Sequence, residues 1–155
     1  MTAPAERRQA PRVTREPRHR AREAALQMLY QWEVGRADIA DVAETYWLHE
    51  QPGGGSLAGD QRAFAVRLAT GAAGAVGELD PMIAEAAEHW RIERMNVLDR
   101  LILRLAVYEL LRESETPGPV IINEALELAR TFSHDDSVRF INGLLDAIRR
   151  RLQRE

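Results

Sequence analysis

Residues 97–111 read VLDRLILRLAVYELL, and this stretch decides the fold. Apolar side chains recur at helical spacing on nearly every side of it, interrupted by Arg100, Arg104, Tyr108 and Glu109. A helix that is apolar almost all round is buried, because a surface helix carries a polar face. We therefore expect this segment to be a helix in the centre of the domain.

Amphipathic helices are predicted on both sides of the central segment. Apolar residues recur on one helix face from Ala21 to Trp32, where Gly35 is a plausible stop, and again from Val138 to Leu152. The residues expected to cap or open the other helices are Asp38, Asp60, Pro81, Asn96, and Ser133 with Asp136. The helix opened by Pro81 is expected to include Trp90 on its apolar side. No segment of strand length alternates between apolar and polar residues with a period of two. The expected class is therefore all-α, with about seven helices in two packed bundles.

The domain boundaries follow from composition. Residues 1–17 are rich in Pro and Arg and poor in apolar residues, which predicts a disordered extension. Residues 18–155 are expected to form the helical domain. Its N-terminal bundle would cover about 18–77 and its C-terminal bundle about 78–152, divided near a Gly-rich loop and Pro81.

Charge is distributed unevenly along the chain. Residues 1–22 hold seven Arg and two Glu, and residues 149–155 hold four Arg and one Glu, whereas the net charge of the whole chain is −3. Basic ends around an acidic body suggest a polyanion at the ends and a basic partner on the body. Solvated tails would give the same pattern. Every basic residue is Arg, which suits phosphate contact but is also expected from a GC-rich genome.

Catalytic and metal-binding patterns are missing from the sequence. The chain has no Cys, and its four His residues are scattered. The three glycines at 53–55 follow no strand and precede no Lys, so they indicate a linker rather than a phosphate loop. We therefore expect no enzyme activity and no cofactor. Neither a membrane-spanning run nor a secretory signal is present, which predicts a cytoplasmic protein.

Two short regions combine arginine with aromatic residues. Arg18, Arg20 and Arg22 lead into the first predicted helix, on which Tyr30 lies off the apolar stripe. Guanidinium groups attract phosphates and aromatic rings stack on unpaired bases, so this combination favours single-stranded RNA. On the last helix Phe140 also lies off the stripe, beside Arg139 and Asn142. From periodicity alone, packing between the bundles is an equally good explanation for Phe140.

Three segments resemble the NusB family. Residues 18–42 (RHRAREAALQMLYQWEVGRADIADV) are similar to the opening of its members, and residues 97–111 to their central helix with its Tyr-Glu-Leu end. Residues 120–145 (VIINEALELARTFSHDDSVRFINGLL) carry the Ile-Asn-Glu-Ala, Asp-Ser and Phe-Ile-Asn-Gly elements in register. The resemblance covers residues 18 to about 152 and is general rather than specific over 60–95.

The resemblance implies an all-α antitermination factor. Members of the family bind the single-stranded boxA element of nascent ribosomal RNA together with the ribosomal protein NusE. The pair joins RNA polymerase complexes that resist termination, and some members form homodimers.

The resemblance also implies site residues. The RNA-facing candidates are Arg18, Arg20, Arg22, Tyr30, Asp136, Ser137 and Phe140, to which we add Arg139. Tyr108 and Glu109 resemble the NusE-facing surface, and we expect Glu109 to be exposed there to a basic partner. Asn123 and Glu124 are expected instead to be structural, with Asn123 inside the bundle.

Two alternatives compete with this interpretation. NusB-like domains also occur fused to rRNA cytosine methyltransferases, but this chain lacks the Cys that such chemistry needs. A purely structural dimerisation module with only non-specific RNA affinity is the other alternative. Arginines that are buried or neutralised in an interface would favour it.

Overall fold

The computed structural model describes residues 10–49, 57–88 and 90–155, and all regular structure in these ranges is helical. This result confirms the expected all-α class. The seven α-helices of the described ranges are α2 (Ala10–Gly35), α3 (Ile39–Thr45), α4 (Gly59–Gly74), α5 (Val76–Ala86), α6 (Val97–Arg112), α7 (Gly118–Phe132) and α8 (Asp135–Leu152). Two short 3-10 segments are η1 (Tyr46–His49) and η2 (Ile92–Arg94). None of these helices is long and apolar enough to cross a lipid bilayer.

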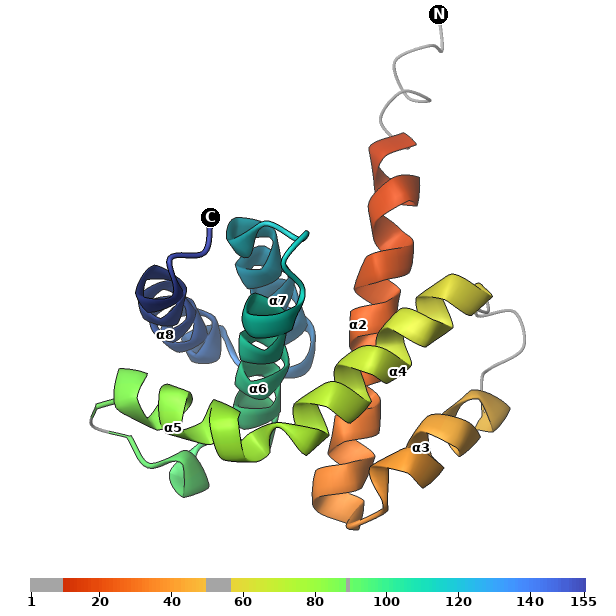
Figure 1. The fold of residues 1–155 in the computed structure, drawn as a ribbon, viewed down its shortest axis with the longest axis horizontal. Coiled ribbons are helices and arrows are strands. Elements are labelled where there is room, and N and C mark those ends of the chain that lie inside the picture. The colour runs from red at the N-terminus through yellow and green to blue at the C-terminus, as the bar shows by residue number, and fades with distance from the viewer. Residues whose placement is uncertain (1–9, 50–56, 89) are drawn as a thin grey trace, which may run out of the picture.

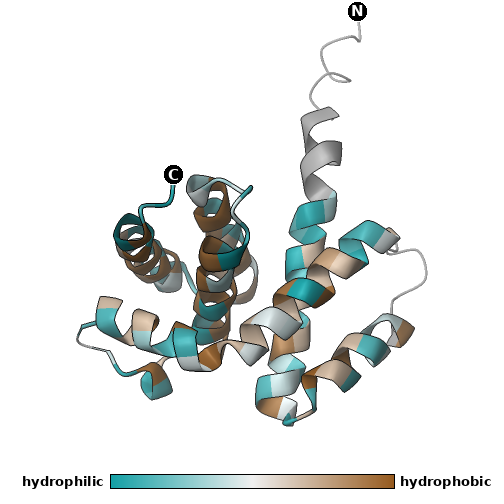
Figure 2. Cartoon of the chain, in the orientation of Figure 1, coloured by the Kyte–Doolittle hydropathy of each residue, from teal (hydrophilic) through white to brown (hydrophobic). Residues whose placement is uncertain are grey.

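Helix α6 lies in the centre, as its sequence predicts. It contacts α2 and α4 on one side and α5, α7 and α8 on the other (Figure 1). Its side chains are buried along most of its length, and α6 is among the most hydrophobic elements of the molecule (Figure 2). A helix with neighbours on several sides has little surface left for polar residues, which accounts for its apolar sequence.

The helices form two groups that share one core. Helices α2, α3 and α4 pack on one another, and α5 to α8 form the second group (Figure 1). A single hydrophobic cluster runs through both groups, with α6 joining them. The chain passes from one group to the other at Ala75, between α4 and α5. The boundary at residues 77 and 78 stays a prediction.

Two of the predicted helix caps are confirmed and two are wrong. The side chains of Asp38 and Asn96 each accept a backbone N–H two residues further on, at 2.9 and 2.8 Å. Helix α4, by contrast, begins at Gly59, so Asp60 lies in its first turn. Ser133 does not cap α8, because its hydroxyl donates to the carboxylate of Asp99.

Two prolines lie inside helices. Helix α2 begins at Ala10 and contains Pro17, ahead of the expected start of the helical domain at residue 18, and the disordered extension over residues 1–17 stays a prediction. Residues 1–9 lie outside the described ranges. Helix α5 begins at Val76, and its first turn is held by N–H groups that bond the carbonyl of Ala75, so Pro81 lies inside the helix rather than opening it.

Helix α4 approaches α6 closely at one glycine. A Cβ atom on Gly71 would overlap the ring of Tyr108. Only glycine leaves room for the ring at this crossing. By comparison, a Cβ atom on Gly74, one turn further along, would meet nothing within 4 Å.

Candidate nucleic-acid interface

The three candidate arginines of α2 occupy different environments. The side chain of Arg22 is only 2% exposed and forms a bidentate ion pair with Glu109 of α6, at 2.9 and 2.8 Å. Glu109 is also 2% exposed. The expectation that Arg22 faces RNA and that Glu109 faces a partner protein is therefore corrected. Each residue has the other as its partner, inside the chain.

Burial and pairing act in opposite directions on this ion pair. Burial lowers the pKa of Arg22, but the hydrogen bonds and charge of Glu109 together with the charges of Glu124 and Glu113 outweigh it, so the net shift is upward. Burial raises the pKa of Glu109, while the hydrogen bonds and charge of Arg22 lower it, and burial prevails. Without Arg22, only effects that raise the pKa of Glu109 would remain, namely burial and the charges of Glu113 and Glu124.

The other groups at the start of α2 are also engaged with the rest of the chain. Arg18 is exposed, and its guanidinium carbon lies 4.6 Å from the ring centroid of Phe64 on α4. Arg20 is half-buried and lines a shallow hollow beside Tyr46 and Trp47. Nδ1 of His19 lies 2.8 Å from the carboxylate of Glu124 on α7. Arg18 therefore offers the most accessible cation of the three candidate arginines.

Tyr30 lies towards the other end of α2 and is 41% exposed, as its position off the apolar stripe predicted. One turn later, Glu33 pairs with Arg100 and Arg104 near the start of α6. Helices α2 and α6 are therefore antiparallel. Tyr30 lies one turn before Glu33, whose partners are in the N-terminal half of α6, and Arg22 pairs with Glu109 in its C-terminal half.

The candidates on α8 also gather at the N-terminal end of α6. The hydroxyl of Ser137 is buried and donates to Asp99 at 2.8 Å, so Ser137 ties α8 to α6 instead of facing solvent. Asp136 and Arg139 are exposed. Within the described part of the chain, no ion pair involves Arg139.

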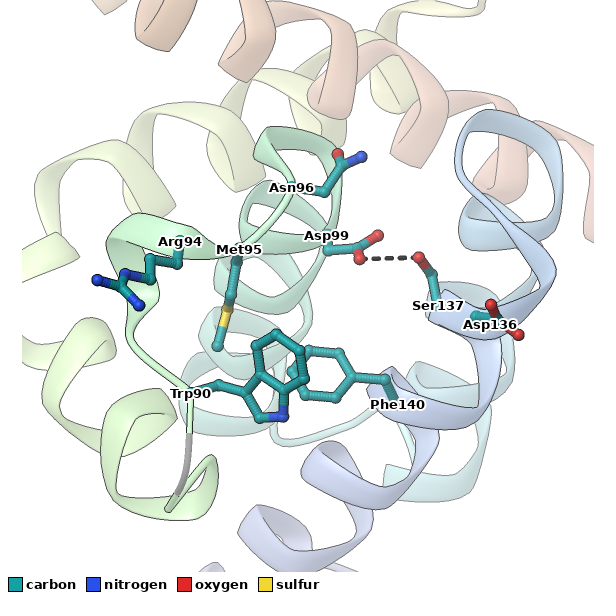
Figure 3. A pocket seen from close by; sticks show the side chains of 8 residues that line it. All are labelled: Trp90, Arg94, Met95, Asn96, Asp99, Asp136, Ser137 and Phe140. Atoms are coloured by element: carbon teal, nitrogen blue, oxygen red, sulfur yellow. Dashed lines mark hydrogen bonds between the residues drawn. The ribbon is translucent and has the colours of Figure 1, made fainter.

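Phe140 borders a pocket of about 240 Å³ that the sequence analysis missed (Figure 3). Asp136 and Ser137 line this pocket with it, and the rest of the wall is formed by Trp90, Arg94, Met95, Asn96 and Asp99. The ring centroids of Trp90 and Phe140 are 5.8 Å apart at an interplanar angle of 65°. The pocket thus brings three of the predicted site residues together.

The placement of Trp90 was predicted wrongly. It was expected on the apolar side of a helix, but α5 ends at Ala86 and Trp90 is 58% exposed. The available signal was the sequence Trp90-Arg-Ile-Glu-Arg94, in which a tryptophan follows the apolar periodicity but is surrounded by charged residues.

The candidate partner-facing residues also differ from each other. Tyr108 is half-buried, with its ring over Gly71. Asn123 is exposed, so it does not lie inside the bundle as expected, whereas Glu124 is buried and bonds His19. Among the described residues, no three side chains capable of holding a metal ion come together.

The candidates therefore divide between two ends of α6. We call the group Arg22, Tyr108 and Glu109 the closed end, and the group Tyr30, Trp90, Asp136 and Phe140 the open end. About ten residues of helix, or roughly 15 Å, separate them. The closed end consists mainly of groups that partner one another, whereas at the open end Trp90, Asp136 and Phe140 line a pocket and Tyr30 is exposed on α2.

Comparison with known proteins identifies the family. The family model described as "NusB family" matches residues 19–150. The transcription antitermination protein NusB of Solibacter usitatus is 45% identical over 139 residues, covering 87% of this chain and 90% of that protein. The protein of the same name from Koribacter versatilis is 44% identical, covering 89% and 92%. Both relatives are named as transcription antitermination proteins, the class of protein that the three sequence motifs predict.

Solved structures share the fold. NusB of T. maritima superposes with a TM-score of 0.76 at 33% identity, covering 86% of this chain and 90% of that one. A chain from a crystal structure of the antitermination factors NusB and NusE in complex with dsRNA has a TM-score of 0.73. It covers 88% of this chain and 98% of its own length, and at 24% identity it supports the fold alone. With one family model across most of its helices and close relatives over nearly its whole length, the chain belongs to the NusB family.

Proposed function

We propose that this chain is an antitermination factor that binds the single-stranded boxA element of nascent rRNA together with NusE. The pair then joins an RNA polymerase complex that resists termination. The observation that carries the RNA-binding part is the open end of α6. There exposed Asp136 and half-buried Phe140 line a pocket, Arg139 between them in the sequence is exposed, and Tyr30 is exposed on α2.

The proposed RNA path runs from the open end towards Arg18. The two ends of α6 are roughly 15 Å apart, so the strand would cross more than one turn of this helix. Exposed Arg18 and Arg139 would contact phosphates, and the aromatic residues would stack on bases. Arg22 would contribute indirectly, because it fixes α2 against α6.

The proposed NusE contact centres on Tyr108. Glu109 lies beneath the surface, so we assign it a positioning role in which its ion pair with Arg22 fixes that part of α6. Tyr108→Ala is therefore the better test of this surface, because Glu109→Arg would also place two positive charges together in the core. We expect Tyr108→Ala to weaken NusE binding and to leave RNA binding by the isolated protein unchanged.

A fluorescence-anisotropy titration tests the proposal. A boxA-type single-stranded RNA and a scrambled RNA are each titrated at two salt concentrations, with and without purified NusE, and NusE alone serves as the control. We expect preference for the boxA-type RNA and tighter binding when NusE is present. Equal, weak binding to both RNAs that disappears at higher salt, even with NusE, would refute the proposal.

A structural dimerisation module with only non-specific RNA affinity is the second candidate function. The burial of Arg22 supports only the weak RNA affinity of this candidate, because Glu109 neutralises this cation inside the chain rather than in an interface between two copies. Sedimentation analysis of the same samples distinguishes the two. A stable homodimer that binds both RNAs equally would favour the module, and a preference for boxA-type RNA would exclude it.

A further inference from the structure

Trp90 is an exposed aromatic residue for which the packing of the chain gives little reason. It is 58% exposed, whereas Trp32 and Trp47 are partly buried against the core. It lies between two hollows, since it lines the pocket with Phe140 and also a shallow depression beside Pro81 and Ile92. A large apolar ring held in this position costs solvation free energy, which is recovered when a flat ligand covers it.

We infer that Trp90 is the stacking platform for one unpaired base of the single-stranded RNA, with Phe140 supporting its edge. This inference rests on the proposed function, because it assumes that the chain binds RNA at the open end. It changes the role of Phe140, which the sequence analysis treated as a stacking residue itself.

The ring geometry determines which aromatic residue carries the base. Trp90 and Phe140 meet edge to face, with centroids 5.8 Å apart, so a base does not fit between them as between two parallel plates (Figure 3). Phe140 is half-buried and Trp90 is the more exposed ring. A base therefore stacks on the open face of Trp90, while the Phe140 contact holds that ring in place.

The surroundings of the pocket suit a nucleobase. Met95 is buried beside the rings, and Asn96 and Asp136 are exposed polar residues in the pocket wall (Figure 3). Amide and carboxylate groups are hydrogen-bonding partners for base edges. The volume of about 240 Å³ is below the roughly 300–1,000 Å³ of clefts for drug-sized ligands, which suits one small planar group.

Charge contributes little at this position. The exposed charged residues nearest Trp90 in the sequence are Glu88, Arg91, Glu93 and Arg94, two of each sign, and exposed Asp136 in the pocket wall adds a negative charge. Stacking rather than phosphate attraction must therefore supply the affinity from Trp90. If Trp90 is a stacking platform, truncating its side chain should lower the affinity for RNA without changing the salt dependence of binding.

The test uses the full-length chain and boxA-type single-stranded RNA, followed by fluorescence anisotropy at several salt concentrations. Trp90→Ala should weaken binding by at least about five-fold, with the salt slope unchanged, and Trp90→Phe should recover part of the loss. Leu48→Ala is the matched control, because it truncates an exposed apolar side chain (78% exposed) in η1, outside the pocket. Thermal melts of all variants confirm that they fold alike.

A scan of abasic sites through the RNA gives a readout that a merely structural role would not change. One abasic position should weaken binding to the wild-type chain but have little effect on Trp90→Ala. Wild-type binding that prefers boxA-type RNA, with Trp90→Ala within two-fold of it, would overturn the platform while the proposed function stands. Loss of NusE binding with intact RNA binding would identify Trp90 as a protein contact instead. If the wild-type chain binds no RNA even with NusE present, both proposals fail.

Discussion

The closed and open ends of α6 use similar residue types in opposite ways. At the closed end Arg22 and Glu109 satisfy each other with almost no exposure to solvent, and Tyr108 lies over a glycine. At the open end Trp90, Asp136 and Arg139 are exposed. Whether a charged or aromatic group can contact a ligand therefore depends on what packs over it. Substitutions at the closed end should change stability, and those at the open end should change RNA binding.

The largest expected effect is at the buried ion pair. Arg22→Met should lower the free energy of unfolding by about 3–5 kcal/mol, because it leaves Glu109 buried without a partner. Replacing both partners, as in Arg22→Met with Glu109→Leu, should restore most of this loss. Urea unfolding measures both variants, with Arg18→Met as the exposed control. If Arg22→Met cost no more than Arg18→Met, the closed end would not be held by this pair.

The crossing of α4 and α6 should be the next most sensitive point of the closed end. Gly71→Ala should cost about 1–3 kcal/mol, because the added methyl group forces the Tyr108 ring to move. Thermal unfolding measures the loss. The matched control is Gly74→Ala, which has open space around it and should be neutral or slightly stabilising. Equal effects of the two substitutions would show that the ring moves away freely.

At the open end, Tyr30→Ala should weaken RNA binding by about 1–3 kcal/mol, because a stacking ring is lost. The expected change in the free energy of unfolding is small, since Tyr30 is 41% exposed. Anisotropy titrations and urea unfolding of the same variant make the comparison. A variant that lost stability but kept RNA affinity would remove the distinction between the two ends.

Arg139→Ala should produce a smaller change, which is visible mainly in the salt dependence. Loss of one phosphate contact to a single strand should reduce the slope of log K against log salt by about 0.7. Arg130→Ala on α7 is the control, because its guanidinium pairs with Glu127 on the same helix. Should both variants flatten the slope equally, Arg139 would have no special place in the interface.

The smallest expected effect belongs to a surface ion pair. Arg112 and Glu78 are each about half exposed, and their charges are 3.0 Å apart. Arg112→Ala should change the free energy of unfolding by no more than about 1 kcal/mol, because solvent screens such pairs. Urea unfolding beside Arg22→Met then compares an exposed and a buried ion pair in one chain. Similar losses of unfolding free energy from the two substitutions would mean that burial does not determine how much the Arg22–Glu109 pair stabilises the fold.

Much of the fold could be predicted from the sequence, because its signals are local. Residues 97–111 are apolar on nearly every side, which correctly predicted α6 in the centre of the molecule. Asp38 and Asn96 cap helices, as the chemistry of their side chains predicts. The prolines misled the prediction of helix starts, since Pro17 and Pro81 lie inside helices whose first turns are formed upstream. Single-residue propensities are weak wherever the surrounding packing favours a longer helix.

The sequence by itself determined the all-α class, the central helix, and the resemblance carried by three motifs in order, because periodicity and motif spacing are properties of the chain alone. Only the tertiary structure decided that Arg22 and Glu109 face each other in the core, that Ser137 bonds Asp99, and that Trp90 stands exposed beside Phe140. The physical reason is that periodicity places a residue on a helix face but does not say what covers that face. Contacts between residues 87 positions apart, as in Arg22 and Glu109, form only when the helices pack.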